Sequence, residues 1–220
     1  FLEAKENADF IFEEDVSDID FKNKKVKTKG KTYAYDKLVI ASGGITLKNS
    51  GSDGKIFDLI KKEIPITQMT YAITNYETRE KLSKKAKGTK VTAKASLYVG
   101  SKLIKSSIDD VIFQDYGLTG TAILDISNDL SQNLMEQNSS HIYIDFFPEY
   151  SREEFAGYLA SLITKFAKRS IKDILIGVIN EKLLDDILKI SHIKPHKKGF
   201  EINERDFESL VSTLKELRFE

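Results

Sequence analysis

Residues 35–62 read YDKLVIASGGITLKNSGSDGKIFDLIKK, and this stretch governs the expected fold of the first third of the chain. It holds a short apolar run at 38–41, the glycine pair Gly43 and Gly44, and a polar loop before a second apolar segment at 56–60. A continuous apolar run that does not alternate is typical of an inner strand in a parallel sheet covered on both faces. The sequence therefore predicts a strand at 38–41, a glycine break and a helix.

The glycine pair indicates where a ligand would bind in such a sheet. Glycine has no Cβ, so the backbone after the strand can turn sharply or approach a ligand closely. Ligands of open α/β sheets gather at the carboxyl ends of the strands. We therefore expect a site around Ser42, Gly43 and Gly44.

A phosphate-binding loop of the Walker A type is the alternative reading of the loop that follows. That motif needs G-x-x-x-x-G-K-[ST], because its glycines let backbone N–H groups converge and its hydroxyl binds magnesium. Gly54 and Lys55 fit, but Asn49 stands at the first glycine position and Ile56 replaces the hydroxyl. The sequence favours a loop that leads into a helix capped by Ser52 or Asp53.

The clearest strand pattern begins after residue 90. Residues 91–99 are apolar at every second position, which predicts a strand with one buried and one exposed face. Gly100 and Ser101 supply a two-residue turn into residues 102–105, so we expect an antiparallel hairpin. The change of pattern places a domain boundary near residues 73–77.

The segment 111–127, VIFQDYGLTGTAILDIS, contains two glycines that bracket Leu118 and Thr119. Glycines three apart make a tight loop whose N–H groups can face an anion or a carbonyl. Two readings stay open for Gly117, Leu118, Thr119 and Gly120: a loop that faces substrate, and a turn that is tight for packing reasons.

The sequence predicts helices in the last third of the chain and a lysine-rich hairpin near the beginning of the chain. Ser151 and Glu154 form a capping box before a helical apolar pattern, and two further amphipathic stretches follow at 171–188 and 207–214. Residues 21–35 predict a hairpin with its lysines in water, and residues 1–8 predict the end of a helix.

Several stretches together resemble one known family. Residues 35–44, followed by residues 51–62, are similar to the "ATGG" strand and following helix of flavoproteins. Residues 111–127 are similar to the signature "LFTHxGLSGPAIL", and residues 142–148 (IYIDFFP) to the "IDLLP" strand. These motifs occur in the same order in the BaiN/RdsA-type (HI0933-like) family of NAD(P)/FAD-dependent oxidoreductases. One departure is Thr121, which stands where that family has proline after the second glycine.

The resemblance implies a mixed α+β chain with a partial FAD-binding α/β domain followed by an inserted domain. Residues 1–73 would be the second part of the FAD-binding domain. Residues 74–220 would be the inserted, substrate-covering domain, antiparallel β over 74–148 and helical over 149–220. Val16, Ser42, Gly43 and Gly44 would then contact FAD, and residues 117–120 would face a small-molecule substrate. The catalytic residues stay unknown.

The chain lacks a G-x-G-x-x-G fingerprint and starts at Phe1, so we interpret it as a central fragment of a longer flavoprotein. We expect FAD in the full-length parent, but the fragment alone should bind FAD weakly or not at all and be inactive. The open edge of the 38–41 strand should be covered by self-association or rearrangement. The alternative is a stand-alone, non-enzymatic binding module for a protein or peptide.

The amino-acid composition excludes or disfavours several classes of protein. The 220 residues carry 34 basic and 34 acidic side chains, and this zero net charge argues against a nucleic-acid or anionic-membrane surface. Cysteine is absent, which excludes disulfides and is compatible with a cytoplasmic location. No apolar run has the length of a membrane span.

Metal and acid–base chemistry find little support in the sequence. His192 and His196 have the spacing of zinc ligands on a helix, but Pro195 would break that helix, so we expect no metal site. His141 is expected in solvent, and Asp185 and Asp186 are expected to be surface charges.

Overall fold

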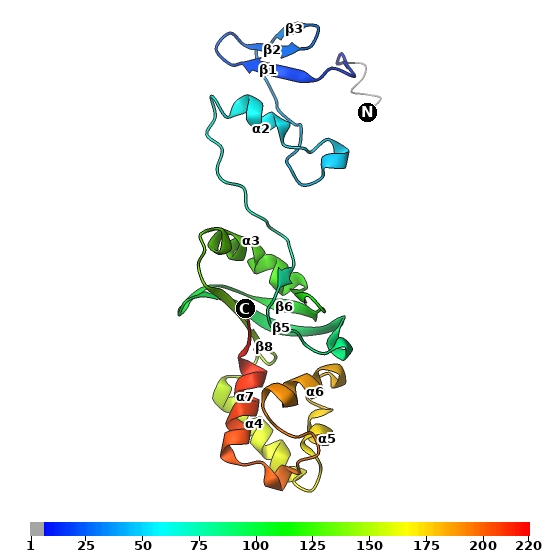
Figure 1. Ribbon diagram of the computed structural model, residues 1–220, viewed down its shortest axis with the longest axis vertical. Helices are drawn as coiled ribbons and strands as arrows, with labels where there is room; N and C mark the ends of the chain where they lie inside the picture. The colour runs from blue at the N-terminus through cyan, green and yellow to red at the C-terminus, as the bar shows by residue number, and fades with distance from the viewer. Residues whose placement is uncertain (1–6) are drawn as a thin grey trace. The chain divides into compact units, whose positions relative to one another are not determined.

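The computed structural model describes residues 7–220, which form two compact units that meet between Met69 and Thr70. Both units contain antiparallel sheets and helices, so the mixed α+β class is confirmed (Figure 1). The helix end predicted for residues 1–8 falls mainly on residues 1–6, outside the described part of the chain.

The first unit contains a three-stranded sheet in the order β1-β2-β3. Its strands are β1 (Val16–Asp20), β2 (Lys25–Thr28) and β3 (Thr32–Ala34), all antiparallel. The predicted lysine hairpin is confirmed as β2 and β3, with the lysines at 25, 27, 29 and 31 exposed. A short 3-10 turn, η1 (Lys48–Ser50), and helix α2 (Lys55–Ile60) follow, and α2 contacts β1.

The strand predicted at 38–41 is absent from this unit, so that prediction is wrong for the described residues. Residues 38–44 are irregular, and Val39 is 85% exposed. A strand needs a neighbour to receive its backbone hydrogen bonds. Among the described residues no segment pairs with 38–41, so the apolar run stays uncovered. The helix predicted after the glycine loop is confirmed as α2, but its N-cap is Gly54 and not the predicted Ser52 or Asp53.

The second unit is built on a six-stranded sheet in the order β4-β7-β6-β5-β8-β9. The strands are β4 (Tyr76–Glu77), β5 (Thr89–Val99), β6 (Lys102–Phe113), β7 (Gly117–Thr119), β8 (Ser140–Asp145) and β9 (Leu217–Phe219). Beyond the two edge strands, the Arg79 N–H donates to the Glu220 carbonyl oxygen at 2.6 Å. This hydrogen bond brings the two edges together, so the sheet curves toward a barrel.

The predicted hairpin at 91–105 is confirmed as β5 and β6, which turn at Gly100 and Ser101. The alternation places Ala93, Ala95 and Leu97 on the buried face with no exposed surface. Helix α3 (Thr121–Met135) packs on β5 and β6. Residues 111–127 therefore run from the end of β6 through the short strand β7 into α3.

The helical part follows β8 and returns to the sheet through β9. It consists of α4 (Arg152–Lys165), α5 (Ile171–Leu175), α6 (Glu181–Ile190) and α7 (Glu204–Lys215), with short 3-10 turns η2 (Lys84–Ala86) and η3 (Gly199–Glu201) beside them. The Ser151 capping box is confirmed. The stretch 171–188 forms two helices, because Asn180 caps a new one. Among the described residues, no helix is long and apolar enough to span a membrane.

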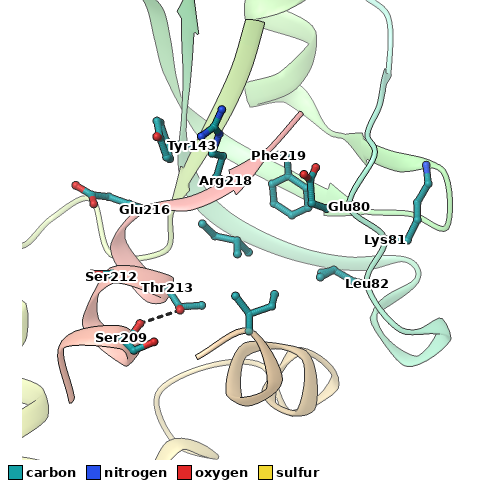
Figure 2. A pocket seen from close by; sticks show the side chains of 12 residues that line it. Glu80, Lys81, Leu82, Tyr143, Ser209, Ser212, Thr213, Glu216, Arg218 and Phe219 are labelled. Atoms are coloured by element: carbon teal, nitrogen blue, oxygen red, sulfur yellow. Dashed lines mark hydrogen bonds between the residues drawn. The ribbon is translucent and has the colours of Figure 1, made fainter. Parts of the chain in front are cut away.

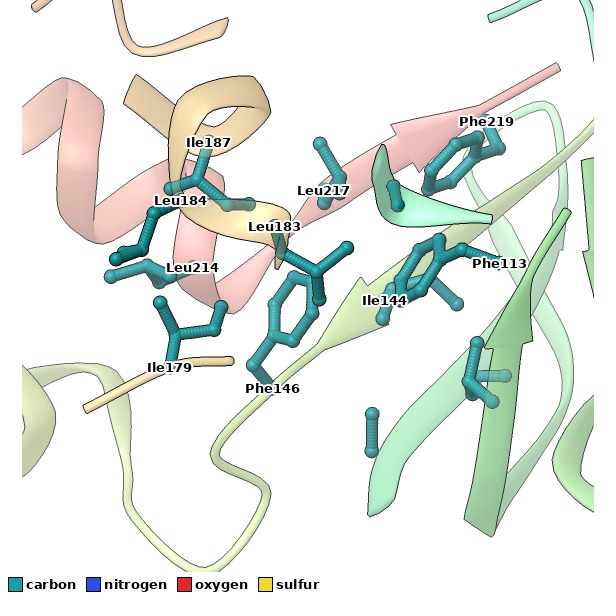
Figure 3. Packing of buried hydrophobic residues seen from close by; sticks show 14 of the residues in the cluster. Phe113, Ile144, Phe146, Ile179, Leu183, Leu184, Ile187, Leu214, Leu217 and Phe219 are labelled. Atoms are coloured by element: carbon teal, nitrogen blue, oxygen red, sulfur yellow. The ribbon is translucent and has the colours of Figure 1, made fainter. Parts of the chain in front are cut away.

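One hydrophobic core joins the sheet to these helices (Figure 3). The Phe113 ring lies between Phe146, at 6.0 Å, and Phe219, at 6.2 Å, and its side chain is 1% exposed. Leu183 and Leu214, from α6 and α7, belong to the same cluster. Burial of each such side chain contributes about 1.5 to 3 kcal/mol, so the β and helical parts stabilise each other.

Candidate functional site

The residues predicted to contact FAD gather around the start of α2. The Gly54 N–H donates to the Gly44 carbonyl oxygen at 3.1 Å, which closes the loop between them. The pKa of Lys55 is raised by its hydrogen bond and ion pair with Asp53 and, to a smaller extent, by the charge of Asp15. Since Asp15 directly precedes Val16, the first strand and the glycine loop share one neighbourhood.

The two glycines of the pair differ in the space around them. Gly43 has a φ of +77°, and a Cβ there would lie 2.4 Å from the Ser52 Oγ. A Cβ on Gly44 would meet nothing within 4 Å. Ser42 is exposed, and Val16 is 42% exposed at the end of β1. Open space beside Gly44 fits a cofactor that approaches the backbone closely.

Close backbone packing surrounds the second predicted site, residues 117–120. A Cβ on Gly117 would lie 2.2 Å from the Tyr76 carbonyl oxygen, and one on Gly120 would lie 2.3 Å from that of Asp110. Leu118 between them is fully buried in the core. The packing of β7 against β4 and β6 accounts for both glycines, while a role in binding substrate stays a prediction.

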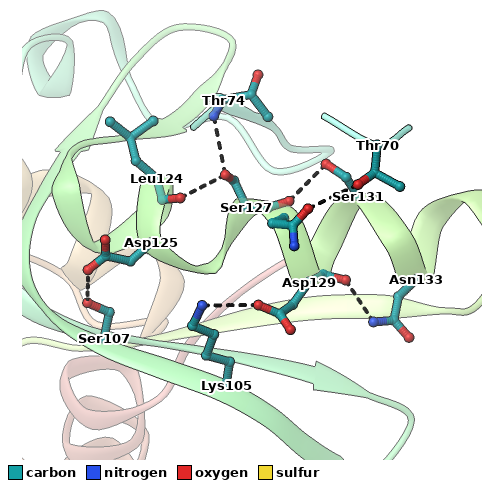
Figure 4. Close-up of polar contacts among 11 residues, drawn as sticks. Thr70, Thr74, Lys105, Ser107, Leu124, Asp125, Ser127, Asp129, Ser131 and Asn133 are labelled. Atoms are coloured by element: carbon teal, nitrogen blue, oxygen red, sulfur yellow. Dashed lines mark hydrogen bonds and ion pairs between the residues drawn. The ribbon is translucent and has the colours of Figure 1, made fainter. Parts of the chain in front are cut away.

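Thr119 is the polar member of this loop, and its side chain is hydrogen-bonded to the segment before β4. Its hydroxyl donates to the Asn75 side-chain oxygen just before β4. The segment before Asn75 is fixed on α3 in turn: the Thr70 hydroxyl donates to the Asn128 side chain at 3.0 Å, and the Thr74 N–H donates to the Ser127 Oγ at 3.2 Å (Figure 4). The loop and residues 70–75 therefore form one hydrogen-bonded assembly.

A cavity of about 570 Å³ in the second unit was not foreseen from the sequence (Figure 2). It lies between the edge strand β9, the segment after β4 and the helices α6 and α7. It is lined by Glu80, Lys81, Leu82, Tyr143, Ile190, Ser209, Ser212, Thr213, Glu216, Leu217, Arg218 and Phe219. No periodic pattern links these positions, because they come from five separate parts of the second unit: the segment after β4, β8, α6, α7 and β9.

Most polar groups around this cavity already have hydrogen-bond or ion-pair partners. Glu80 accepts from the Glu220 N–H at 2.7 Å, and Arg218 pairs with the Glu220 carboxylate at 2.5 Å. The Thr213 hydroxyl donates to the Ser209 carbonyl oxygen at 2.8 Å. The cavity can hold a small, largely apolar molecule, but the described residues place no nucleophile beside a base there.

His141 is buried, so its predicted exposure to solvent is wrong. It lies at the start of β8 as expected, but only 7% of it is exposed. Its ring stacks on Tyr98 at 5.8 Å and meets Tyr143 edge-on at 5.2 Å. Burial lowers the pKa of His141, the charge of Arg218 lowers it further, and Glu220 partly opposes both effects.

Asp186 is also buried, contrary to the expectation of a surface charge. Its carboxylate accepts from the Ser83 N–H at 3.0 Å and from the Ser83 hydroxyl at 2.7 Å, which ties α6 to η2. Asp185 remains half-exposed and pairs with Lys172 and Lys85. Among the described residues, no group of three or more His, Cys, Asp or Glu residues is placed to hold a metal ion.

Comparison with known proteins gives two matches. The model of a family described as "HI0933-like protein barrel and H2TH domain" matches residues 73–220. The chain is also similar to a 3-dehydro-bile acid delta(4,6)-reductase of Clostridium scindens, with 22% identity over 192 residues. The alignment covers 87% of this chain and 47% of that relative, so the chain spans about half the length of the curated relative.

Proposed function

The chain belongs to the HI0933-like family, and from this premise we propose that it is the central part of a flavin-dependent oxidoreductase. The match of residues 73–220 to the family's barrel domain is the observation that carries the proposal. The similar protein from Clostridium scindens is named as a reductase. The proposed parent protein oxidises or reduces a small molecule by hydride transfer through FAD.

In this proposal the two predicted domains have different roles. Residues 1–73 hold part of FAD, with Val16, Ser42, Gly43 and Gly44 providing contacts through their backbone. Residues 74–220 cover the substrate, and residues 117–120 face it. Flavin supplies the redox chemistry when bound, and the protein supplies position and electrostatics. The fragment alone is expected to bind FAD weakly or not at all.

The flavin content of the longer parent protein tests the cofactor contacts. Gly44→Val fills the open space beside the backbone without meeting another described atom within 4 Å of its Cβ. The variant should therefore fold normally and lose most of its bound flavin, measured by absorbance after purification. Gly30→Val is the matched control, because the space at Gly30 is also open. Equal flavin content in both variants contradicts the assignment of Gly44.

The fragment itself supplies a second test. Purified residues 1–220 should be colourless and inactive with flavin added. A yellow preparation with bound flavin would show that these residues suffice for binding and would overturn this part of the proposal.

The uncovered apolar residues of the first unit carry a related proposal on association. Val39 is 85% exposed, and Leu47, Phe12 and Ile11 are also more than half exposed. Exposed apolar surface of this kind promotes contacts between chains. We expect self-association of the fragment in sedimentation-velocity experiments, reduced by Val39→Ser. A monomer at all concentrations contradicts this expectation.

A further inference from the structure

Two loops of the helical part lie side by side and form a single surface, which we call the basic loop pair. It consists of residues 165–172, which run from the last residue of α4 into the first turn of α5, and residues 192–200, after α6. The Ile171 N–H donates to the Lys197 carbonyl oxygen at 2.7 Å, and the Gly199 N–H donates to that of Arg169 at 3.0 Å. A bridge between Ser170 and Lys198 completes the connection. The loops are therefore fixed relative to each other.

Positive charge is concentrated on this surface. The two loops contain Lys165, Lys168, Arg169, Lys172, Lys194, Lys197 and Lys198, and their sequences include no carboxylate. Lys172 pairs with Asp185 and Lys197 with Asp206. Among the described residues, the other five cations have no carboxylate within ion-pair distance, and all five are exposed.

Aromatic rings lie among these cations. The Lys165 Nζ is 5.5 Å from the centre of the Phe166 ring, and the Arg169 Cζ is 5.1 Å from it. Phe200 at the end of the second loop is 69% exposed, and its N–H donates to the Ala167 carbonyl oxygen at 3.0 Å. An exposed ring beside free cations offers stacking and charge at the same place.

The surface is also hollowed. One hollow of about 360 Å³ is lined by residues 164–169. A second of the same volume is lined by His192, Lys194, His196, Lys197 and Glu201. Apart from the Glu201 carboxylate, which accepts from the Lys198 N–H at 2.6 Å, the second hollow is lined by groups that suit an anion.

We propose that the basic loop pair binds single-stranded nucleic acid, with phosphates at the free cations and a base on Phe200. Charge complementarity favours an anionic partner, because residues 165–172 and 192–200 carry seven basic and no acidic side chains, with Asp173 and Glu201 directly after them, in a chain of zero net charge. The hollows and the single exposed ring favour a flexible chain of phosphates and bases over a flat bilayer. Total charge gives no information on such a surface, because acidic residues elsewhere in the chain balance its basic side chains in the sum.

Fluorescence anisotropy with a labelled oligothymidine of about 20 nucleotides tests this proposal, between about 50 and 200 mM salt. The whole 220-residue chain should bind, with an affinity that falls as salt rises. Lys168→Gln/Lys194→Gln/Lys198→Gln should lower the slope of log affinity against log salt by about 2, since each phosphate contact contributes about 0.7. Phe200→Ser should weaken binding at least about fivefold through lost stacking.

The lysine hairpin of the first unit provides a matched control. Lys25→Gln/Lys29→Gln/Lys31→Gln removes the same charge from exposed positions and should leave the affinity and the salt slope unchanged. Circular dichroism confirms that each variant is folded. Absence of binding at low salt, or equal losses in both triple variants, overturns the proposal. Stronger binding of phosphatidylserine vesicles or polyglutamate than of the oligonucleotide, lost in the loop variant, overturns it in favour of that other partner.

Discussion

The two units of this chain contain similar proportions of apolar residues, but the second unit buries many more of them than the first. Residues 76–219 share one continuous core, whereas Ile19 is the one buried apolar side chain among the described residues of the first unit. The first unit instead exposes Val39, Leu47 and Phe12. A stretch can carry the pattern of a buried strand and remain uncovered when the described residues offer no partner. An apolar pattern thus indicates that a segment needs to be buried, but whether it is buried depends on another segment that can pack against it.

The largest expected effect contrasts a core residue with an exposed one. Phe113→Ala removes a ring packed between two others and should lower the free energy of unfolding by about 3 to 5 kcal/mol. Val39→Ala should change it by no more than about 0.5 kcal/mol, because Val39 is exposed. Urea unfolding followed by circular dichroism measures both. If Val39→Ala lowered the free energy of unfolding as much as Phe113→Ala does, Val39 would have to be buried as well.

A second pair of variants compares glycines in the two units. Gly120→Ala places a Cβ against the Asp110 carbonyl oxygen at a φ of +101°, so we expect a loss of about 1 to 3 kcal/mol from overpacking. Gly44→Ala meets open space and should be nearly neutral. Urea unfolding curves compare the stability of the two variants. An unchanged midpoint for Gly120→Ala would mean that β6 and β7 can move apart to make room for the Cβ.

Two neighbouring aspartates test whether the connection between α6 and η2 contributes to the stability of the second unit. Asp186→Ala leaves the Ser83 N–H without its partner and should cost about 1 to 3 kcal/mol. Asp185→Ala removes half-exposed ion pairs and should cost at most about 1 kcal/mol. Thermal unfolding compares them. If Asp185→Ala were the more damaging variant, the hydrogen bonds to Ser83 would not be the main connection.

The smallest effect concerns pH and should arise in the second unit alone, because residues 1–69 contain no histidine. The lowered pKa of His141 means that the unfolded chain binds a proton more readily. Stability from neutral His141 is therefore fully present above its ordinary pKa and declines as the pH falls through the folded pKa. Tyr98, Tyr143, Arg218 and Glu220 surround this ring or act on its charge.

Unfolding free energies at pH 7, 6 and 5 measure this decline. His141→Phe retains a stacking ring and should reduce the slope. The carboxylates of Asp18 and Asp20, whose pKa values are lowered by hydrogen bonds with Lys27 and Asn23, titrate below this range. An unaltered slope in His141→Phe would assign the pH dependence to another group.

The sequence predicted the elements that depend on neighbouring residues, but it did not predict features that depend on contacts between segments far apart in the sequence. The β5–β6 hairpin, the Ser151 cap and α2 depend on neighbouring residues, and all three are confirmed. The strand at 38–41 and the cavity beside β9 depend on segments far apart in sequence. His141 is buried because Tyr98 comes from another strand, which no pattern near residue 141 reveals.

Asp186 is a different case, since a local signal was present. It lies three residues after Leu183 and directly before Ile187, both fully buried, so it falls beside the apolar face of α6. A carboxylate at such a position requires a buried partner, and Ser83 provides it. The predicted cofactor and substrate residues remain expectations, because their roles depend on molecules that bind to the chain.

The core shared by Phe146, Leu183, Leu214 and Phe219 has a practical consequence for protein engineering. A cut at residue 148, between the β and helical segments, would expose both halves of this core and remove β9 from the edge of the sheet. Each piece would then tend to aggregate when expressed alone. Transplanting the barrel into another protein therefore requires residues 70–220 as a single block, with both its first strand and its last.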